Sequence, residues 1–273
     1  MSSISTATKK FIISQIDKVV NKYLQKAKVT PKSDSNNPFV MAILRDFEPL
    51  LHRIHGLKTS LGSEMEKIAE IIAIDAWGKE NVNRKLNVNV KLPQNVFQTI
   101  DSIINNLSNA KKLSNYNEEK ELIIRACNNP STLFEEHTYE FDLQLFNKSA
   151  NQLYFIEMKG PDPNTTEVPG AKKRLLVAMA YGYIYLLNKN GNIESKFGIY
   201  YNNKFPKPYR NPKVHYYFDP NGGILVQEDF WNFIGQNDST YVELLTIFEL
   251  YGRSNKKRIW DGFSKLIEIN NKK

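Results

Sequence analysis

The segment from residue 137 to residue 158 most constrains what this chain can fold into. Apolar and polar residues alternate over His137–Phe146 (HTYEFDLQLF), as in a strand with one buried face. Asn147–Asn151 (NKSAN) is a polar turn, and Gln152–Met158 (QLYFIEM) is a second strand-like run. The sequence therefore predicts an antiparallel hairpin, against which the rest of the chain builds a sheet.

The rest of the chain alternates between helical and strand-like patterns. Before the hairpin, the apolar spacing predicts helices over residues 8–27, 39–54, 63–77, 94–109 and 116–127, with a glycine-bounded loop at 56–62. After it, we expect a helix over 171–187, strands over 197–201, 215–218 and 224–226, and a helical tail over 228–265. The pattern predicts one α/β domain over residues 1–273, mostly helical over 1–130, with its core and C-terminal helices over 131–273. A separate N-terminal helical subdomain is the alternative.

Composition narrows the class of protein. Lys and Arg number 37 against 29 Asp and Glu, and the resulting formal charge of +8 is consistent with a polyanionic partner. One cysteine and four histidines are too few for a disulfide framework or a zinc cluster, which indicates a reducing, cytoplasmic setting. No apolar run approaches the roughly 18–20 residues of a membrane span, so we expect no membrane partner.

Asp142 and Glu157 are the residues that predict chemistry. If the hairpin turns near Ser149, Asp142 lies opposite position 156 or 157, with Cβ atoms about 5 Å apart. Two carboxylates at that distance repel each other unless a cation lies between them, and a hard divalent metal fits oxygen ligands. Lys159 points to the same strand face as Glu157, where its ammonium group could position a water molecule.

A solvated strand face with an ordinary Glu–Lys pair is the alternative for this short pattern. Three local features favour a functional site. The second strand is too apolar to be an exposed edge, and its charges gather at its C-terminal end, where α/β sites form. The proline-containing loop GPDPN starts directly after Lys159 and opens space beside it.

Asp142 followed by Glu157-Met158-Lys159 resembles the PD-(D/E)XK signature of restriction-endonuclease-like nucleases, with Phe141 in place of the proline. The longer stretches IEMKGPDPNTTEVPGAKKRLL and ILVQEDFWNFIG are similar to type II restriction endonucleases of the TdeIII type, whose targets are GGNCC-like. The resemblance extends over most of residues 40–265. It implies a restriction-endonuclease-like α/β fold, in which a mixed central sheet is flanked by helices and joined to a large helical N-terminal part.

The resemblance also implies roles for individual residues. Asp142 and Glu157 would bind Mg²⁺ together with the carbonyl of Met158, and Lys159 would orient or deprotonate the water that attacks a DNA phosphodiester. A glutamate of an early helix often approaches the metal in this fold. Glu66 is the preferred candidate, whereas a solvated helix face is the alternative, and the rivals within the same segment are Glu64 and Glu70.

Two basic segments are candidate DNA contacts. Lys172, Lys173 and Arg174 lie in the first turn of a predicted helix, where cations oppose the helix dipole, and this favours a phosphate-facing role. Lys207 and Arg210 lie in a stretch stiffened by three prolines, where Arg210 could read guanine and Lys207 could grip phosphate. A solvated surface is the alternative for both segments.

The function that these residues predict is a Mg²⁺-dependent, sequence-specific endonuclease that cleaves double-stranded DNA. A short palindromic target is read most simply by a homodimer, and a restriction enzyme implies a cognate DNA methyltransferase. The alternatives are a structure-specific or repair nuclease of the same fold, and a nucleic-acid-binding protein without catalytic activity.

Overall fold

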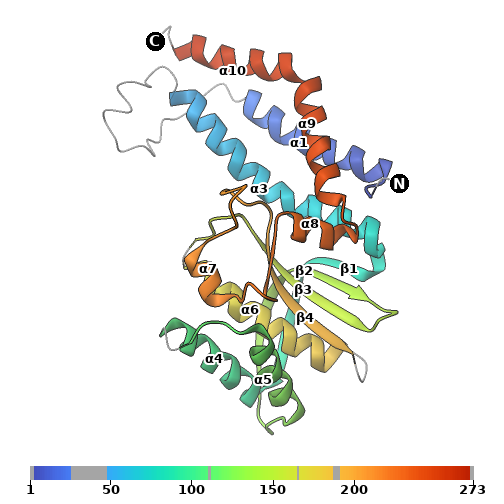
Figure 1. Cartoon of the computed structure of the whole chain (residues 1–273), viewed down its shortest axis with the longest axis vertical. Coiled ribbons are helices and arrows are strands. Elements are labelled where there is room, and N and C mark those ends of the chain that lie inside the picture. The colour runs from blue at the N-terminus through green and yellow to red at the C-terminus, as the bar shows by residue number, and fades with distance from the viewer. Residues whose placement is uncertain (1–2, 26–47, 110–111, 165, 187–190, 271–273) are drawn as a thin grey trace. The chain divides into compact units, whose positions relative to one another are not determined.

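The computed structural model describes residues 3–25, 48–109, 112–164, 166–186 and 191–270 (Figure 1). The chain forms two compact units. One comprises Met1–Ile71 with Val242–Lys273, and the other comprises Ile72–Tyr241. A single functional domain over residues 1–273 stays a prediction.

The first unit is helical. Asp17 connects three of its helices, because Asp17 Oδ1 accepts hydrogen bonds from Tyr251 Oη (2.7 Å) and from Arg258 Nη2 (2.5 Å). The hydrogen bond from Arg258 is the main cause that holds the pKa of Asp17 below its usual value. The unit contains α1 (Thr6–Gln25), α10 (Lys256–Asn270) and most of α3 (Glu48–Trp77) and α9 (Thr240–Ser254).

A five-stranded mixed sheet forms the centre of the second unit, in the order β1-β2-β3-β4-β5. The first three strands pair antiparallel, and the last three pair parallel. This arrangement confirms the predicted mixed sheet and is compatible with a restriction-endonuclease-like fold. The strands are β1 (Val82–Pro93), β2 (Phe134–Asn147), β3 (Gln152–Lys159), β4 (Asn192–Ile199) and β5 (Ile224–Val226).

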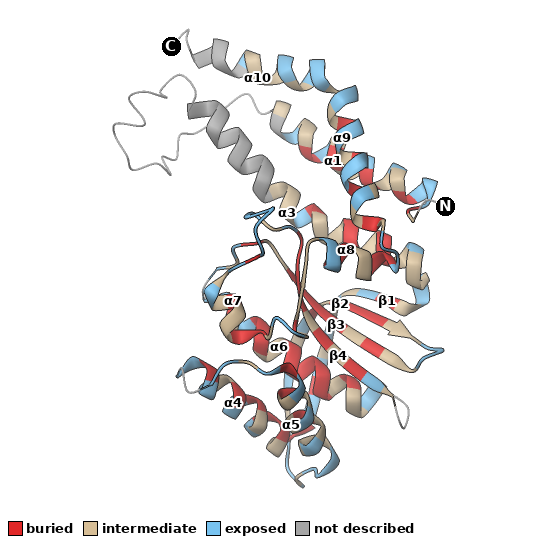
Figure 2. Ribbon diagram, viewed as in Figure 1, coloured by how far each residue is buried: buried red, intermediate tan, exposed pale blue. Residues whose placement is uncertain are grey.

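Helices cover both faces of this sheet. On one face, Phe155 and Phe197 belong to a buried core shared with α4 (Gln94–Ser108), α5 (Tyr116–Asn128) and α6 (Glu167–Tyr181). On the other face lies α8 (Glu228–Gly235), whose Phe230 packs so closely on Gly198 that a Cβ atom there would meet its ring at 2.6 Å. Figure 2 shows the resulting buried residues along the central strands and α6. A short η2 (Lys79–Asn81) precedes β1, and a π-helical turn, η3 (Gly182–Leu186), follows α6.

The structure corrects two of the expected elements before the hairpin. No strand was expected within residues 1–130, which were predicted to be mostly helical, yet β1 forms an edge strand of the sheet. The expected loop at 56–62 is wrong, since α3 runs without interruption from Glu48 to Trp77. Residues 39–47 of the helix expected at 39–54 lie outside the described part of the chain, and residues 48–54 belong to α3.

The expected strand at 215–218 is also wrong, because most of this segment lies in the helix α7 (Pro212–Tyr217). Asn211 caps this helix: its side chain accepts hydrogen bonds from the backbone N–H groups of Lys213 and Val214, both at 3.2 Å. Pro212 stands at the first helical position, where its fixed φ suits the helix.

Candidate active site

The hairpin register brings the two predicted carboxylates opposite each other. The ladder between β2 and β3 pairs Asn147 with Gln152 and continues to Leu143 and Ile156. The next residues along the two strands are Asp142 and Glu157. The predicted hairpin register is therefore confirmed up to Leu143 and Ile156, whereas the roles of Asp142 and Glu157 stay a prediction.

The pairing of β1 with β2 is interrupted at one residue beside Asp142. The ladder between β1 and β2 pairs Arg84 with Leu143 and resumes at Leu86 with Phe141. Lys85 lies between the two pairs with a φ of 51°, which residues other than glycine rarely adopt. β3 lies on the opposite side of β2 from β1, and there Asp142 Oδ2 accepts a hydrogen bond from the Met158 N–H at 2.9 Å.

Two cations meet the carboxylates. Lys159 Nζ lies 2.8 Å from Glu157 Oε1 and 3.5 Å from Asp142 Oδ2, so one ammonium group contacts both. Arg174, on α6, donates from Nε to Glu157 Oε2 at 3.1 Å and from Nη2 to Oε1. The Glu157 side chain is only 2% exposed, whereas that of Arg174 is 34% exposed.

The pKa values of the two carboxyl groups shift in opposite directions. Burial and the neighbouring Glu157 charge raise the pKa of Asp142. Burial would also raise the pKa of Glu157, but the hydrogen bonds from Arg174 and the charge of Lys159 hold it below its usual value. For Lys159, burial acts to lower the pKa, and the two carboxylates outweigh it and raise the pKa. Separated pKa values of two adjacent acids are typical of functional sites.

The donor set fits a hard divalent cation. Asp142 and Glu157 are oxygen donors that converge on one point, since the ammonium group of Lys159 contacts both of them. Among the described residues, no group of three or more His, Cys, Asp and Glu side chains could hold a metal ion. The protein side chains therefore offer two carboxylates, to which a backbone carbonyl such as that of Met158 can be added.

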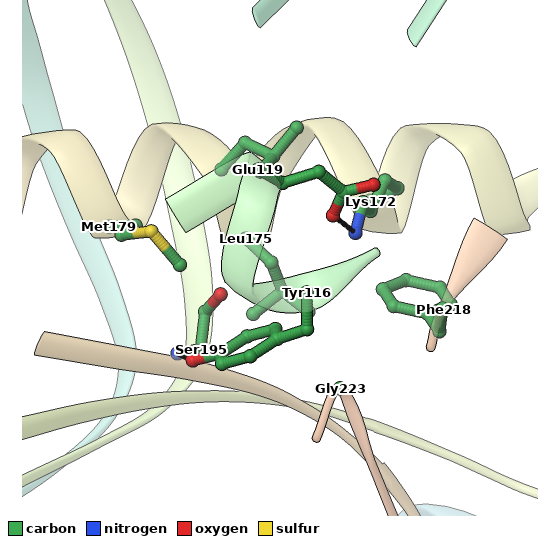
Figure 3. A pocket seen from close by; sticks show the side chains of 9 residues that line it. Tyr116, Glu119, Lys172, Leu175, Met179, Ser195, Phe218 and Gly223 are labelled. Atoms are coloured by element: carbon green, nitrogen blue, oxygen red, sulfur yellow. Dashed lines mark hydrogen bonds and ion pairs between the residues drawn. The ribbon is translucent and has the colours of Figure 1, made fainter. Parts of the chain in front are cut away.

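The three predicted cations lie in the second turn of α6, because this helix begins at Glu167 and not at Ala171 as expected, so the argument from the helix dipole does not apply to them. Their surroundings differ. Lys172 is buried, and its Nζ donates to Glu119 on α5 (Figure 3). The same Nζ also donates to Ser114 Oγ at 3.2 Å. This burial argues against the predicted phosphate contact of Lys172. Lys173 pairs with the exposed Asp101 at 2.6 Å, and Arg174 contacts Glu157.

The remaining candidates are Lys207, Arg210 and three glutamates of α3. Lys207 and Arg210 are exposed on the loop between β4 and α7. Glu66 and Glu70 lie on α3 within the first unit, and so does Glu64, which pairs with Lys67 at 2.9 Å. The contribution of these glutamates to the site stays a prediction.

The loop between β4 and α7, which carries Lys207 and Arg210, is hydrogen-bonded to Lys159 and to the residues that follow it. The N–H of Tyr200 donates to the Lys159 carbonyl at 3.1 Å, where β4 ends beside β3. Further along, Tyr209 Oη donates to the Pro161 carbonyl at 2.8 Å, and Asn203 Nδ2 donates to Asp162 Oδ2 at 2.5 Å. These bonds hold the loop that carries Lys207 and Arg210 next to the end of the active-site strand.

Comparison with known proteins decides the family. Residues 4–252 match the family described as "Type II restriction endonuclease, HinfI". The chain belongs to this family. Its members act on DNA, and the chain is accordingly a sequence-specific restriction endonuclease, a site-specific deoxyribonuclease.

Individual relatives agree with this family. The chain is 26% identical over 268 residues to the type II restriction enzyme MjaII of Methanocaldococcus jannaschii, covering 86% of this chain and 68% of that protein. It is 28% identical over 229 residues to the type II restriction enzyme HgiCII of Herpetosiphon aurantiacus, covering 81% and 80%. No solved structure matches the chain. None of the described helices is both long and apolar enough to cross a membrane.

Proposed function

We propose that Asp142, Glu157 and Lys159 form the active site of this restriction endonuclease, in the manner of the PD-(D/E)XK enzymes, with Mg²⁺ as cofactor. The observation that carries the proposal is the convergence of both carboxylates on one ammonium group. Such a convergence concentrates negative charge at a single point, which is where a divalent ion and a phosphate oxygen could be held together.

Asp142 and Glu157 would hold Mg²⁺, with the carbonyl of Met158 as a further donor. When bound, the ion polarises the phosphate and lowers the pKa of a coordinated water. Lys159 Nζ lies within hydrogen-bond reach of Glu157, so its ammonium group can also orient a water held beside this carboxylate. The raised pKa of Lys159 favours this role over the alternative, in which Lys159 deprotonates the water. Arg174 fixes the buried Glu157 side chain from α6.

The DNA contacts proposed outside the active site are Lys173, Lys207 and Arg210. What supports the last two is their exposure on a loop that is bonded to Pro161 and Asp162, directly after the active-site strand. Arg210 would read a base edge and Lys207 a phosphate. The resemblance to the TdeIII type supports a GGNCC-like target.

We further propose that the enzyme acts as a homodimer in the cytoplasm, paired with a cognate DNA methyltransferase. A palindromic target has two-fold symmetry, so one active site for each strand follows from a two-fold dimer. The methyltransferase would modify the same target, because the endonuclease would otherwise cleave the DNA of its own cell.

Digestion of plasmid DNA with Mg²⁺, followed by sequencing of the fragment ends, tests the proposed cofactor and target together. We expect discrete fragments whose ends share one GGNCC-like sequence, and no cleavage when Mg²⁺ is replaced by EDTA. Preferential cleavage of branched substrates would favour a structure-specific nuclease. Cleavage that persists in EDTA would contradict the metal-dependent site.

A further inference from the structure

The charges around Glu157 are balanced before any metal binds. Asp142 and Glu157 supply two negative charges, and Lys159 and Arg174 supply two positive charges in direct contact with them. A divalent cation adds two positive charges to this cluster. Like charges at such short range repel strongly in a partly buried site, so metal binding requires at least one of the resident cations to give up its contact.

Arg174 is the cation whose contacts a metal must displace at Glu157. Both carboxylate oxygens of Glu157 accept hydrogen bonds from Arg174, through Nε at 3.1 Å and through Nη2. The Glu157 side chain is 2% exposed, so the packing around it restricts the rotation that would turn a free lone pair of the carboxylate towards an incoming ion. A metal ligand at Glu157 and the two-pronged contact from Arg174 therefore compete for the same oxygens.

Lys159 and Arg174 differ in how readily they can leave. Lys159 comes from the same strand as Glu157 and contacts both carboxylates. Arg174 comes from α6, contacts Glu157 alone among these two, and has a side chain that is 34% exposed. Arg174 can thus turn to solvent without moving a strand.

Once the guanidinium group of Arg174 has left Glu157, a DNA phosphate held at the site would be a suitable new partner for it. Arginine binds phosphate oxygens through two parallel hydrogen bonds, in the geometry that it uses with a carboxylate. We propose that Arg174 exchanges Glu157 for a DNA phosphate when the metal binds, so that it first screens the empty carboxylate and then positions the substrate. This inference rests on the proposed active site.

The test measures metal affinity without DNA and cleavage with DNA, in wild type, Arg174→Gln and Arg174→Lys. Binding of Mn²⁺ to the DNA-free protein is followed by the loss of the EPR signal of the free ion. We expect Arg174→Gln to bind Mn²⁺ about ten- to hundredfold more tightly, because a charge-assisted competitor is gone. Its single-turnover cleavage of plasmid DNA at saturating Mg²⁺ should fall about a hundredfold, because the phosphate contact is lost.

The variant Arg174→Lys shows whether the changes in metal affinity and in cleavage come from the lost arginine contacts or from a defect in folding. It keeps the charge but loses the two-pronged geometry, so both effects should be present and smaller than in Arg174→Gln. Arg125→Gln, an exposed arginine on α5, is the matched control and should leave both measurements unchanged. Circular dichroism of every variant shows whether the fold is retained.

Three results would overturn the inference or its foundation. If Arg174→Gln binds Mn²⁺ no more tightly than wild type, Arg174 only supports Glu157 and the exchange is refuted. If Mn²⁺ affinity rises while cleavage stays unchanged, the phosphate contact is refuted. Glu157→Gln, measured in parallel, tests the foundation: if it binds Mn²⁺ as wild type does, the proposed metal site itself is wrong, whatever Arg174→Gln does.

Discussion

Replacing Lys172 by methionine should strongly destabilise the second unit. Lys172 and Glu119 are 4% and 6% exposed, and the ion pair between them joins α6 to α5 (Figure 3). The Lys172 ammonium group also donates to Ser114 Oγ and lies 5.1 Å from the ring centroid of Phe218. Without it, Glu119 is a buried carboxylate with no counter-ion. We expect a loss of about 3–5 kcal/mol in the free energy of unfolding, the usual cost of breaking such a pair.

The double variant Lys172→Met with Glu119→Leu should recover most of this loss. Burial lowers the pKa of Lys172 even though Glu119 acts to raise it, so the ion pair does not fully offset the desolvation of the ammonium group. Two apolar residues of similar volume avoid that cost. We expect the double variant to lie within about 1 kcal/mol of wild type, or to be more stable.

Urea unfolding followed by far-UV circular dichroism measures both variants. Lys173→Met is the matched control, since Lys173 is the next residue and its pair with Asp101 is at the surface, where a pair contributes at most about 1 kcal/mol. A loss of less than about 1 kcal/mol in Lys172→Met would refute the reasoning. So would a double variant as unstable as the single one, because the cost would then not come from the unpaired charge.

Three further predictions concern the reaction and the assembly. Lys159→Ala should lower the single-turnover rate by about a hundredfold or more while Mn²⁺ binding persists, and parallel loss of both would show that Lys159 only organises the carboxylates. In competition binding to target and random duplexes, Arg210→Ala should cost roughly 1–3 kcal/mol on the target alone, whereas Lys207→Ala should weaken both and reduce the salt dependence by about one ion. Identical behaviour of the two variants would mean that the loop grips only phosphate. Sedimentation should give a homodimer, and a monomer both alone and with target DNA would contradict the two-fold model.

The hairpin could be predicted from the sequence because its signals are local. The alternation over Tyr139–Leu145 and the short turn near Ser149 fix which residues face each other, and they brought Asp142 opposite Glu157. Lys159 followed from the period of two along a strand. The core of the candidate site was therefore available before the structure.

The errors in secondary structure arose where local signals were weighed wrongly. The alternation of apolar and polar residues from Leu86 to Leu92 is a strand signal, and it marks β1 in the sequence. Gly56 and Gly62 suggested a loop, yet a glycine inside a helix costs only about 1 kcal/mol, which the rest of α3 outweighs. The Asn211-Pro212 pair was a helix start that the short apolar run after it concealed.

The surroundings of the α6 cations could not be predicted, because their partners are distant in the sequence. Glu119 is 53 residues before Lys172, and nothing local distinguishes the buried Lys172 from the half-buried Lys173 beside it. The partner of Arg174 is Glu157, 17 residues earlier on another element. Only the packing of α6 on the sheet and on α5 decides which cation meets which carboxylate.

Cleavage by Asp142→Asn and Glu157→Gln tests the proposed metal site most directly. Both substitutions keep the size of the side chain and remove one negative charge, and Glu140→Gln, an exposed position on the same strand as Asp142, is the control. With plasmid DNA and Mg²⁺, we predict that the cleavage rate of each site variant falls at least about a thousandfold, while its affinity for DNA stays at the wild-type value. The control variant should cleave at the wild-type rate. Cleavage by either site variant within about tenfold of wild type would contradict the assignment of these two carboxylates as the metal ligands.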